Sequence, residues 1–308
     1  MQAPPLCPIT GLPALRRIQP ISAKLITDLW HGAFGVATER LLVGVDHFEV
    51  WESPCGLVFF EPMLAGDEIF YLDLHRRGDF HRSLSASRHA RAEFRRIAEL
   101  VRPGSKILDV GCGEGALAPY LPDATYVGLD PNPHATAAQP DIRCETVARH
   151  AATYPEQYDV VCALHVIEHV PDPLSFVHSL VECIRPGGRL CIVAPHRASA
   201  LTKIPNFVLN APPNHLSWWN EDSLQALSQR FDLVVEALEP VPFSFDSVIY
   251  WMGRFAPKLT GERYFRAHWI WHAALIWSWL AGRLFDALFR VPAAAKSSGL
   301  MLIARKPS

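Results

Sequence analysis

The segment from Lys106 to Leu121 constrains the fold more than any other part of this chain. Its sequence, KILDVGCGEGALAPYL, runs from an apolar stretch into Asp109, then through three glycines into a helix-like segment. Glycine tolerates positive φ and has no Cβ, so such a turn lets a ligand approach bare backbone. Open α/β sheets bind nucleotides at turns of this kind, at the carboxyl end of a strand. We therefore expect a nucleotide-type ligand at Gly111, Gly113 and Gly115.

The spacing of these glycines favours a ligand that carries no phosphate. In a GxGxxG turn the N–H groups of the following helix point at a pyrophosphate, whereas this chain reads GCGEG, with Glu114 inside the turn. No Lys-Ser or Lys-Thr pair follows, which excludes the Walker form. Glu114 would repel phosphate, so a ligand with a cationic centre, such as S-adenosylmethionine (SAM), is favoured over NAD. An ordinary glycine-rich turn without a ligand is the alternative at this point.

Later segments repeat the pattern of a strand followed by a helix. The run Tyr126–Asp130 is a second apolar strand that ends in an acid, 21 residues after Asp109. An acid at that distance is placed to accept hydrogen bonds from both hydroxyls of a ribose. Further strands are expected at Tyr158–Leu164 and, after a Pro-Gly-Gly turn, at Arg189–Ala194. Strands that alternate with helices predict an α/β protein with a doubly wound, mostly parallel sheet.

Four strings in this order, LDVGCGEG, VGLDPNP, DVVCALHVIEHVPDP and IRPGGRLCIVAP, resemble those of the class I SAM-dependent methyltransferases. Within that superfamily the chain looks most like the branch of ubiquinone-biosynthesis O-methyltransferases and methyltransferases of sugar and polysaccharide pathways. The resemblance is strong over residues 101–240. It implies a seven-stranded Rossmann-like sheet, SAM as the cofactor, and a methyltransferase domain over residues 101–308.

The resemblance also implies where SAM binds. Asp109 and the glycine backbone would meet the methionine and ribose portions, and Asp130 would hold the ribose hydroxyls. Pro131 would lie against the adenine, while Leu164 and His165 would border the sulfonium. The expected cofactor-binding residues are Asp109, Gly111, Gly113, Gly115, Asp130, Pro131, Leu164 and His165.

The expected reaction is O-methylation of a small molecule: a sugar, a glycolipid precursor or a quinone-like phenol. Methyl transfer from a sulfonium is an in-line displacement, which an enzyme promotes mainly by alignment. A hydroxyl acceptor must also lose a proton, and histidine is the usual base near neutral pH. The candidates at strand ends are His165, His169 and His196, and His215 follows in a PPNHL string. A C- or N-methyltransferase and a SAM-binding partner without turnover are the alternatives.

His165, Glu168 and His169 form an HxxEH pattern, whose members share one face of a helical turn. HxxEH also marks a class of zinc peptidases, an interpretation we reject because the string here follows a strand of the SAM-type sheet. It resembles the ExxEH string of ubiquinone-type O-methyltransferases, which is associated with a divalent metal. No metal is expected, and a metal held by these three residues is the alternative. In the simpler interpretation Glu168 caps a turn or pairs with an arginine.

Residues 1–65 are expected to form a small module that resembles a degenerate zinc ribbon. Related methyltransferases often begin with two CxxC pairs, but here Thr10 and Glu52 replace one cysteine of each pair and leave Cys7 and Cys55. Two thiolates make a poor site for zinc, which prefers four ligands. We expect a metal-free module held by apolar packing. Zinc completed by His31, His47 or Glu52 is the alternative.

Residues 66–100 are expected to form a helical lid or linker over the cofactor. The stretch Ser85–Leu100 has a helical period with Phe94 and Ile97 facing inward. Candidates for lid residues are Tyr71, His75 and Arg76.

A tryptophan-rich insertion is expected over about residues 243–297, between a sixth strand at Phe231–Leu238 and a seventh at Gly299–Ala304. It holds five of the nine tryptophans, and Ala267–Gly282 is almost wholly apolar. At 16 residues this run is shorter than the roughly 20 needed to span a bilayer. Either the insertion packs on the domain or on a second subunit as a homodimer, or residues 265–290 lie on a membrane surface. Tryptophan favours the headgroup zone, and arginines flank the apolar run.

Composition excludes some classes of protein. The chain has 308 residues, 49% of them hydrophobic, and a net charge of −2, which describes a globular protein and not a nucleic-acid binder. Seven cysteines in apparent core strands predict a cytoplasmic protein without a disulfide framework. No secretory signal is recognised at the start. The expected partner is a small-molecule acceptor.

Overall fold

The computed structural model describes residues 3–77, 92–132, 141–242, 246–257, 262–291 and 298–308. The first part of the helix expected at Ser85–Leu100 lies outside these residues, and so does the side chain of His75. In its described part this helix is α4 (Ala92–Leu100), with Phe94 and Ile97 buried as predicted.

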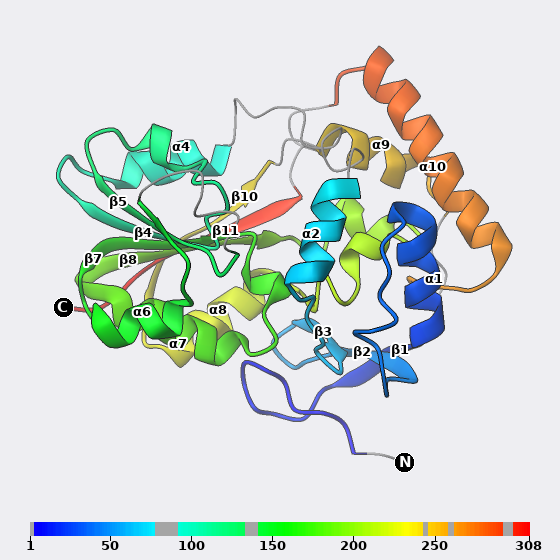
Figure 1. Ribbon diagram of the computed structural model, residues 1–308, viewed down its shortest axis with the longest axis horizontal. Helices are drawn as coiled ribbons and strands as arrows, with labels where there is room; N and C mark the ends of the chain where they lie inside the picture. Colours follow the sequence, from blue (N-terminus) through cyan, green and yellow to red (C-terminus); the bar gives the residue numbers. More distant parts are fainter. Residues whose placement is uncertain (1–2, 78–91, 133–140, 243–245, 258–261, 292–297) are drawn as a thin grey trace.

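A seven-stranded sheet forms the larger half of the molecule (Figure 1). Its strand order is β10-β11-β8-β7-β4-β5-β6, and every neighbouring pair is parallel except the two that involve β11. The mostly parallel, doubly wound α/β sheet expected from the sequence is therefore present. The strands are β4 (Lys106–Val110), β5 (Thr125–Leu129), β6 (Ile142–Arg143), β7 (Tyr158–Leu164), β8 (Ile184–Pro195), β10 (Val234–Val241) and β11 (Gly299–Arg305).

Helices cover both faces of this sheet because its strands are apolar on both sides, as buried parallel strands must be. One face packs on α6 (Val147–Thr153), α7 (Pro173–Cys183) and α8 (Glu221–Arg230), and the other on α4 and the 3₁₀ turn η1 (Ala118–Tyr120). Successive residues alternate between the two cores. Leu108 and Val161 point to the first face, and Ile107 and Val160 to the second.

A second, four-stranded antiparallel sheet occupies the N-terminal part, in the order β1-β2-β3-β9. Its elements are β1 (Arg16–Ser22), α1 (Ala23–Phe34), β2 (His47–Glu52), β3 (Val58–Glu61) and β9 (Ser217–Trp218). Strand β3 joins two cores because its side chains alternate. Phe59 packs with the core of the large sheet, whereas Val58 and Phe60 pack with α1. The fourth strand comes from the other half of the chain, so the two halves are interlocked.

The two knuckle segments of the expected ribbon lie together. The sulfur atoms of Cys7 and Cys55 are 3.8 Å apart, and the backbone N–H groups of Ile9 and Thr10 donate to the Cys7 sulfur. Hydrogen bonding from Cys55 lowers the pKa of the Cys7 thiol well below its usual range. The carboxylate of Glu52 accepts hydrogen bonds from Arg16 and Arg197, so it is engaged by two guanidinium groups beside this pair.

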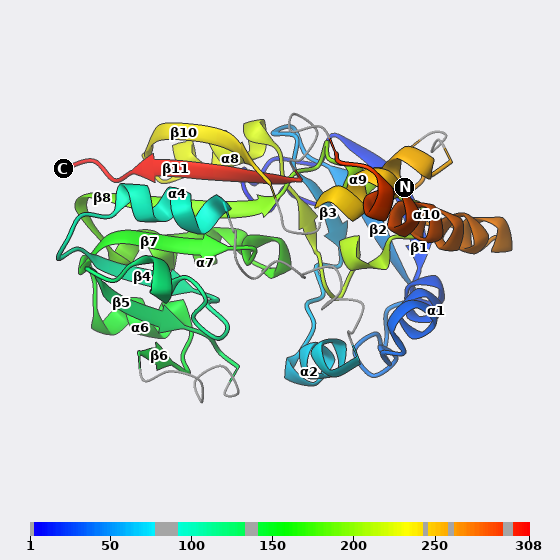
Figure 2. The same ribbon diagram turned by 90° about the horizontal axis from the view of Figure 1, so that it is seen from above.

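The tryptophan-rich insertion forms two helices, α9 (Asp246–Phe255) and α10 (Trp269–Leu288), which pack against each other. Helix α10 is 20 residues long. None of the helices in the described ranges is both long and apolar enough to cross a bilayer. Figure 2 shows α10, α1 and α2 (Glu68–Arg77) in the half of the molecule that faces the carboxyl ends of β4, β7 and β8. The remaining 3₁₀ turns are η2 (Ile167–His169), η3 (Ala200–Lys203) and η4 (Val208–Asn210).

Candidate active site

The glycine turn follows β4 as predicted, and its backbone needs glycine. Gly111, Gly113 and Gly115 have φ values of +73°, +54° and +75°, in the left-handed region that other residues seldom adopt. A Cβ on Gly111 would lie 2.5 Å from the Cγ2 atom of Val166. The prediction of a helix directly after the turn is wrong, because only the short 3₁₀ turn η1 forms there. It contains Pro119, which lacks an N–H group and fits a first helical turn but not a helix interior.

Asp109 lies under the turn and is tied into the protein. Its side chain is buried, and its Oδ2 accepts a hydrogen bond of 2.9 Å from the hydroxyl of Tyr126. The Cys162 thiol lies 3.6 Å from its Oδ1. Burial and the Asp109 charge raise the pKa of Tyr126, so the phenol remains a donor at neutral pH. These contacts fix the end of β4, from which the turn starts.

Asp130 closes the turn from the neighbouring strand β5. Its Oδ2 accepts a hydrogen bond of 2.9 Å from the N–H of Gly113, and its Oδ1 accepts one of 2.9 Å from the N–H of Asn132. A carboxylate has about four lone-pair sites, so both oxygens keep the capacity to accept hydroxyl donors. The carboxylate expected to hold a ribose is therefore positioned by the turn itself.

The loop after β7 connects the glycine turn to the histidines. His165 has a φ of +60°, which is uncommon outside glycine, and its N–H donates to the carbonyl of Val193 on β8. Strained backbone of this kind is retained where the surrounding structure holds it, often at functional sites. The next residue, Val166, is the one that lies against Gly111. The turn and the loop are thus in direct contact.

Glu168 sits at the centre of the histidine cluster. It is 1% exposed, and burial raises its pKa to about 8. Its Oε1 lies 3.8 Å from His165 Nδ1 and 3.8 Å from His169 Nε2, while its Oε2 has no hydrogen-bond partner among the described residues. Within that part of the chain no arginine pairs with Glu168. At neutral pH its carboxyl therefore holds a proton in a large share of molecules.

The tautomers of His169 and His215 follow from their partners. The Nδ1 of His169 lies 2.7 Å from the carbonyl oxygen of Asn214, and the Nδ1 of His215 lies 3.1 Å from the side-chain oxygen of Asn210. Both partners are acceptors, so each Nδ1 carries the proton and each Nε2 carries the lone pair in the neutral ring. The two rings pack edge to face with centroids 4.9 Å apart.

The N-terminal half holds the loop that carries His215. The indole N–H of Trp30 on α1 donates to the carbonyl of Pro212, and that of Trp218 donates to the carbonyl of Asn210, each at 2.9 Å. Tyr71 on α2 lies with its hydroxyl 3.4 Å from His169 Nδ1. The four-stranded sheet and its helices therefore form one wall of the cluster.

The cluster also fits a divalent cation. One ligand atom each from Glu168, His169 and His215 lie within 4.8 Å of one another. Nitrogen and carboxylate oxygen are common ligands, and a second hydrogen bond from each ring fixes its orientation in metal sites. In this group His215, and not His165, joins Glu168 and His169. The HxxEH residues do not share a helical face, because His165 precedes η2 in the left-handed conformation.

Other expected site residues lie in different surroundings. His196 pairs with Glu221 at 3.2 Å, away from the cluster partners described above. Arg76 is exposed at the end of α2, and Pro131 is exposed next to β5. Leu164, the last residue of β7, is half-buried against the core that lies under α4.

Some residues that build the site were missed in the sequence. Asn210 and Asn214 orient the histidines, and Tyr126 and Cys162 contact Asp109. In the sequence, only the position of Asn214 next to His215 in PPNHL could have indicated its role. Tyr126 and Cys162 resemble ordinary strand residues, so nothing in their spacing sets them apart.

Known proteins show similarity in three comparisons. A sequence family described as a methyltransferase domain matches residues 81–238, more than half of the chain. Ubiquinone biosynthesis O-methyltransferases from Klebsiella pneumoniae and Salmonella arizonae are 44% and 41% identical over 99 residues. These alignments cover 28% of this chain and 41% of each relative. The chain thus spans about two fifths of the length of the curated relatives it matches.

Two solved structures are similar to most of this chain. A SAM-dependent methyltransferase from Archaeoglobus fulgidus gives a TM-score of 0.46 at 18% identity, covering 78% of this chain and all of that one. One from Mesorhizobium loti gives 0.44 at 14% identity, covering 71% of this chain and 100% of that one. The family match, the sheet order and the glycine turn agree with one another. The chain belongs to the methyltransferase-domain family and contains a class I SAM-dependent methyltransferase domain.

Proposed function

We propose that this enzyme transfers the methyl group of SAM to a hydroxyl of a small molecule: a sugar, a glycolipid precursor or a quinone-like phenol. The observation that carries the proposal is the pair of histidines whose Nε2 atoms hold lone pairs beside the buried Glu168. A hydroxyl acceptor must lose its proton, and a histidine with a lone pair on Nε2 can receive it.

The donor side binds and orients SAM. The backbone of the glycine turn receives the methionine and ribose portions, with Asp109 supporting the turn and Asp130 accepting from the ribose hydroxyls. SAM supplies the methyl group when bound. The contact between Val166 and Gly111 places the histidine loop beside this turn, so the acceptor hydroxyl and the methyl group are brought to one place.

On the acceptor side His169 is the proposed base. Its Nδ1–H is held by Asn214, which orients Nε2 to receive the hydroxyl proton and stabilises the ring once it is charged. His215 stands at the second face of the acceptor, and His165 borders the sulfonium. Where a divalent cation is bound, Glu168, His169 and His215 would hold it, and it would lower the pKa of a hydroxyl bound to it.

The curated relatives support an oxygen acceptor, because each is named an O-methyltransferase of ubiquinone biosynthesis. The same proposal retains the cytoplasmic location expected from the cysteine usage of the sequence.

Two variants test the proposal separately. Asp130→Ala should weaken SAM binding by about tenfold or more, because loss of a charged hydrogen bond costs about 1.5–3 kcal/mol. Calorimetry with SAM measures this. His169→Gln should leave SAM affinity within twofold but lower transfer of labelled methyl to phenol and sugar acceptors by about 10²-fold or more. Full transfer by His169→Gln, or transfer only to amines or carbon acids, would contradict O-methylation with this base.

A further inference from the structure

Helix α10 carries more exposed large apolar side chains than any other element described. Fifteen large apolar side chains are exposed in the described ranges, and eight of them lie between Trp269 and Phe289. Trp269 is 70% exposed and Trp277 is 60% exposed. Single exposed apolar residues are ordinary, but a contiguous patch of this kind marks an interaction surface.

These side chains form one continuous face. At about 100° per residue, the exposed positions of α10 fall within an arc of about 140°. The positions on this face are Trp269, Ile270, Ala273, Ile276, Trp277, Leu280, Arg283, Leu284, Ala287 and Leu288. The opposite face is packed on α9, where a Cβ on Gly282 would lie 2.7 Å from the Cγ atom of Met252. Figure 1 shows α10 along the outer edge of the molecule.

The charges around this face are mostly basic. In the described residues 246–257 and 262–291 there are five arginines and three acids, a balance of +2, whereas the whole chain carries −2. One of the acids, Glu262, is already paired with Arg16. The exposed apolar face itself contains Arg283 and no acid.

We propose that α10 lies flat on an anionic membrane surface, with its exposed apolar face in the headgroup region. Tryptophan prefers that zone, and arginines attract anionic lipids. The helix is about 30 Å long at 1.5 Å per residue, enough to lie along the surface over its whole length. A second copy of this chain fits less well, because a two-fold interface is self-complementary and this face offers no acid to receive the partner's basic charge.

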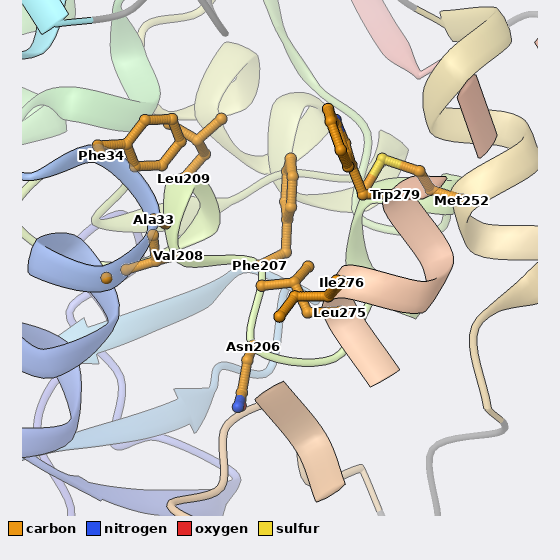
Figure 3. A pocket seen from close by; sticks show the side chains of 11 residues that line it. Ala33, Phe34, Asn206, Phe207, Val208, Leu209, Met252, Leu275, Ile276 and Trp279 are labelled. Carbon is orange, nitrogen blue, oxygen red and sulfur yellow. The ribbon is translucent and has the colours of Figure 1, made fainter. Parts of the chain in front are cut away.

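An apolar pocket lies directly behind the exposed apolar face of α10 (Figure 3). Its volume is about 280 Å³, and Phe34, Phe207, Met252 and Trp279 are among its walls. Ile276 belongs both to this pocket and to the exposed face, where it is 59% exposed. The polar atoms of Asn206 bond to the backbone of Arg266, so that wall is not left with unpaired polar groups.

Two hydrogen bonds link the pocket to the proposed acceptor site. Leu209 lines the pocket, and its carbonyl accepts from the Asn214 side chain, while the backbone carbonyl of Asn214 orients His169. A hydrocarbon chain in the pocket would therefore belong to an acceptor that is drawn from the membrane. The inference that the acceptor's hydrocarbon chain enters the pocket rests on the proposed function, whereas membrane docking does not.

Vesicle co-sedimentation tests the docking. Wild-type protein should bind vesicles of phosphatidylcholine with phosphatidylglycerol, bind pure phosphatidylcholine less, and weaken as salt is raised. The double variant Trp277→Glu/Leu284→Glu should lose tenfold or more of this affinity. The matched control Leu15→Glu/Val43→Glu changes side chains that are 67% and 82% exposed elsewhere and should stay within twofold of wild type.

Three results would overturn the proposal. These are no binding to anionic vesicles at low salt, equal loss in the control, or a dimer in sedimentation that the α10 variant abolishes without vesicle binding. Thermal melts and SAM calorimetry on both variants show whether they are folded. If SAM binding and methyl transfer persist while vesicle binding is absent, docking fails and the proposed function stands.

Calorimetry with dodecanol tests the pocket. Dodecanol should bind the wild type, and Ala33→Trp, which fills the pocket from α1, should abolish this binding while SAM and vesicle binding are kept. Equal dodecanol binding by both proteins would remove the pocket from the proposal.

Discussion

The glycine turn is formed by a single run of sequence, whereas the histidine cluster draws on three segments far apart in the chain. Gly111, Gly113 and Asp130 lie within 20 residues, and the N–H of Gly113 donates to the Asp130 carboxylate. The cluster needs His169, the loop of His215, and an N-terminal half that holds this loop through Trp30. A donor site such as the glycine turn can serve many acceptors, because it does not contact them. The geometry of the histidine cluster changes when any of its three segments changes.

The largest expected effect is on the donor side. Gly111→Ala should cost about 1–2 kcal/mol for the positive φ and about 1–3 kcal/mol more for overlap with Val166, and it should abolish measurable SAM binding. Gly104→Ala is the control, since its φ of +79° imposes the strain while no atom lies within 4 Å of an added Cβ. Urea unfolding measures the loss of stability in both variants. Equal losses of stability would mean that contact with Val166 contributes nothing.

On the acceptor side the buried Glu168 should make stability depend on pH. Its pKa is raised from 4.5 to about 8 by burial, so above pH 4.5 the folded protein retains a proton that the unfolded chain has released. This contribution is complete below pH 4.5 and is lost as pH rises to about 8. Between pH 5 and 8 the free energy of unfolding of the wild type should fall by about 3 kcal/mol. That of Glu168→Gln should not show this fall. Urea unfolding with a chelator present measures both slopes, and parallel slopes would refute the assignment.

A metal titration distinguishes the two possible ligand sets. At a Mn²⁺ concentration of 100 times Kd, the wild type should gain about 2.7 kcal/mol of stability. His215→Ala should lose this gain and His165→Ala should keep it, because His215 lies with Glu168 and His169. Thermal melts with and without Mn²⁺ measure the gain. If His165→Ala loses the gain instead, the HxxEH residues are the ligands.

The smallest effect tests the N-terminal wall. Trp30→Phe removes the hydrogen bond to the Pro212 carbonyl and should cost about 1–2 kcal/mol, raise KM for the acceptor and leave SAM affinity unchanged. Trp51→Phe is the control, because its indole bonds to Glu49 on the same strand. Calorimetry and steady-state kinetics separate the two effects. A change in SAM affinity in Trp30→Phe would mean that the N-terminal wall also positions the donor side.

The same contrast explains which features could be predicted from sequence. Strands such as Tyr158–Leu164 are continuous apolar runs, so their pattern indicates them, and the tip of β5 follows from the spacing to Asp130. Strand β9 has only two residues and forms because Phe59 lies opposite its first residue, Ser217, so no local pattern predicts it. The exposed face of α10 was also beyond reach. Its sequence is apolar on most sides, and periodicity cannot tell an exposed apolar face from a buried one.

The pairing of β3 with β9 has a consequence for synthesis of the chain. The N–H of Phe60 donates to the carbonyl of Leu216, which leaves the ribosome more than 150 residues later. Until then β3 is an edge strand with unpaired backbone and bulky aromatic side chains, the kind of surface that pairs with other chains. The four-stranded sheet of the nascent N-terminal half therefore cannot be completed until β9 has been synthesised. Its solubility in the cell depends on how fast translation, or a chaperone, covers that edge.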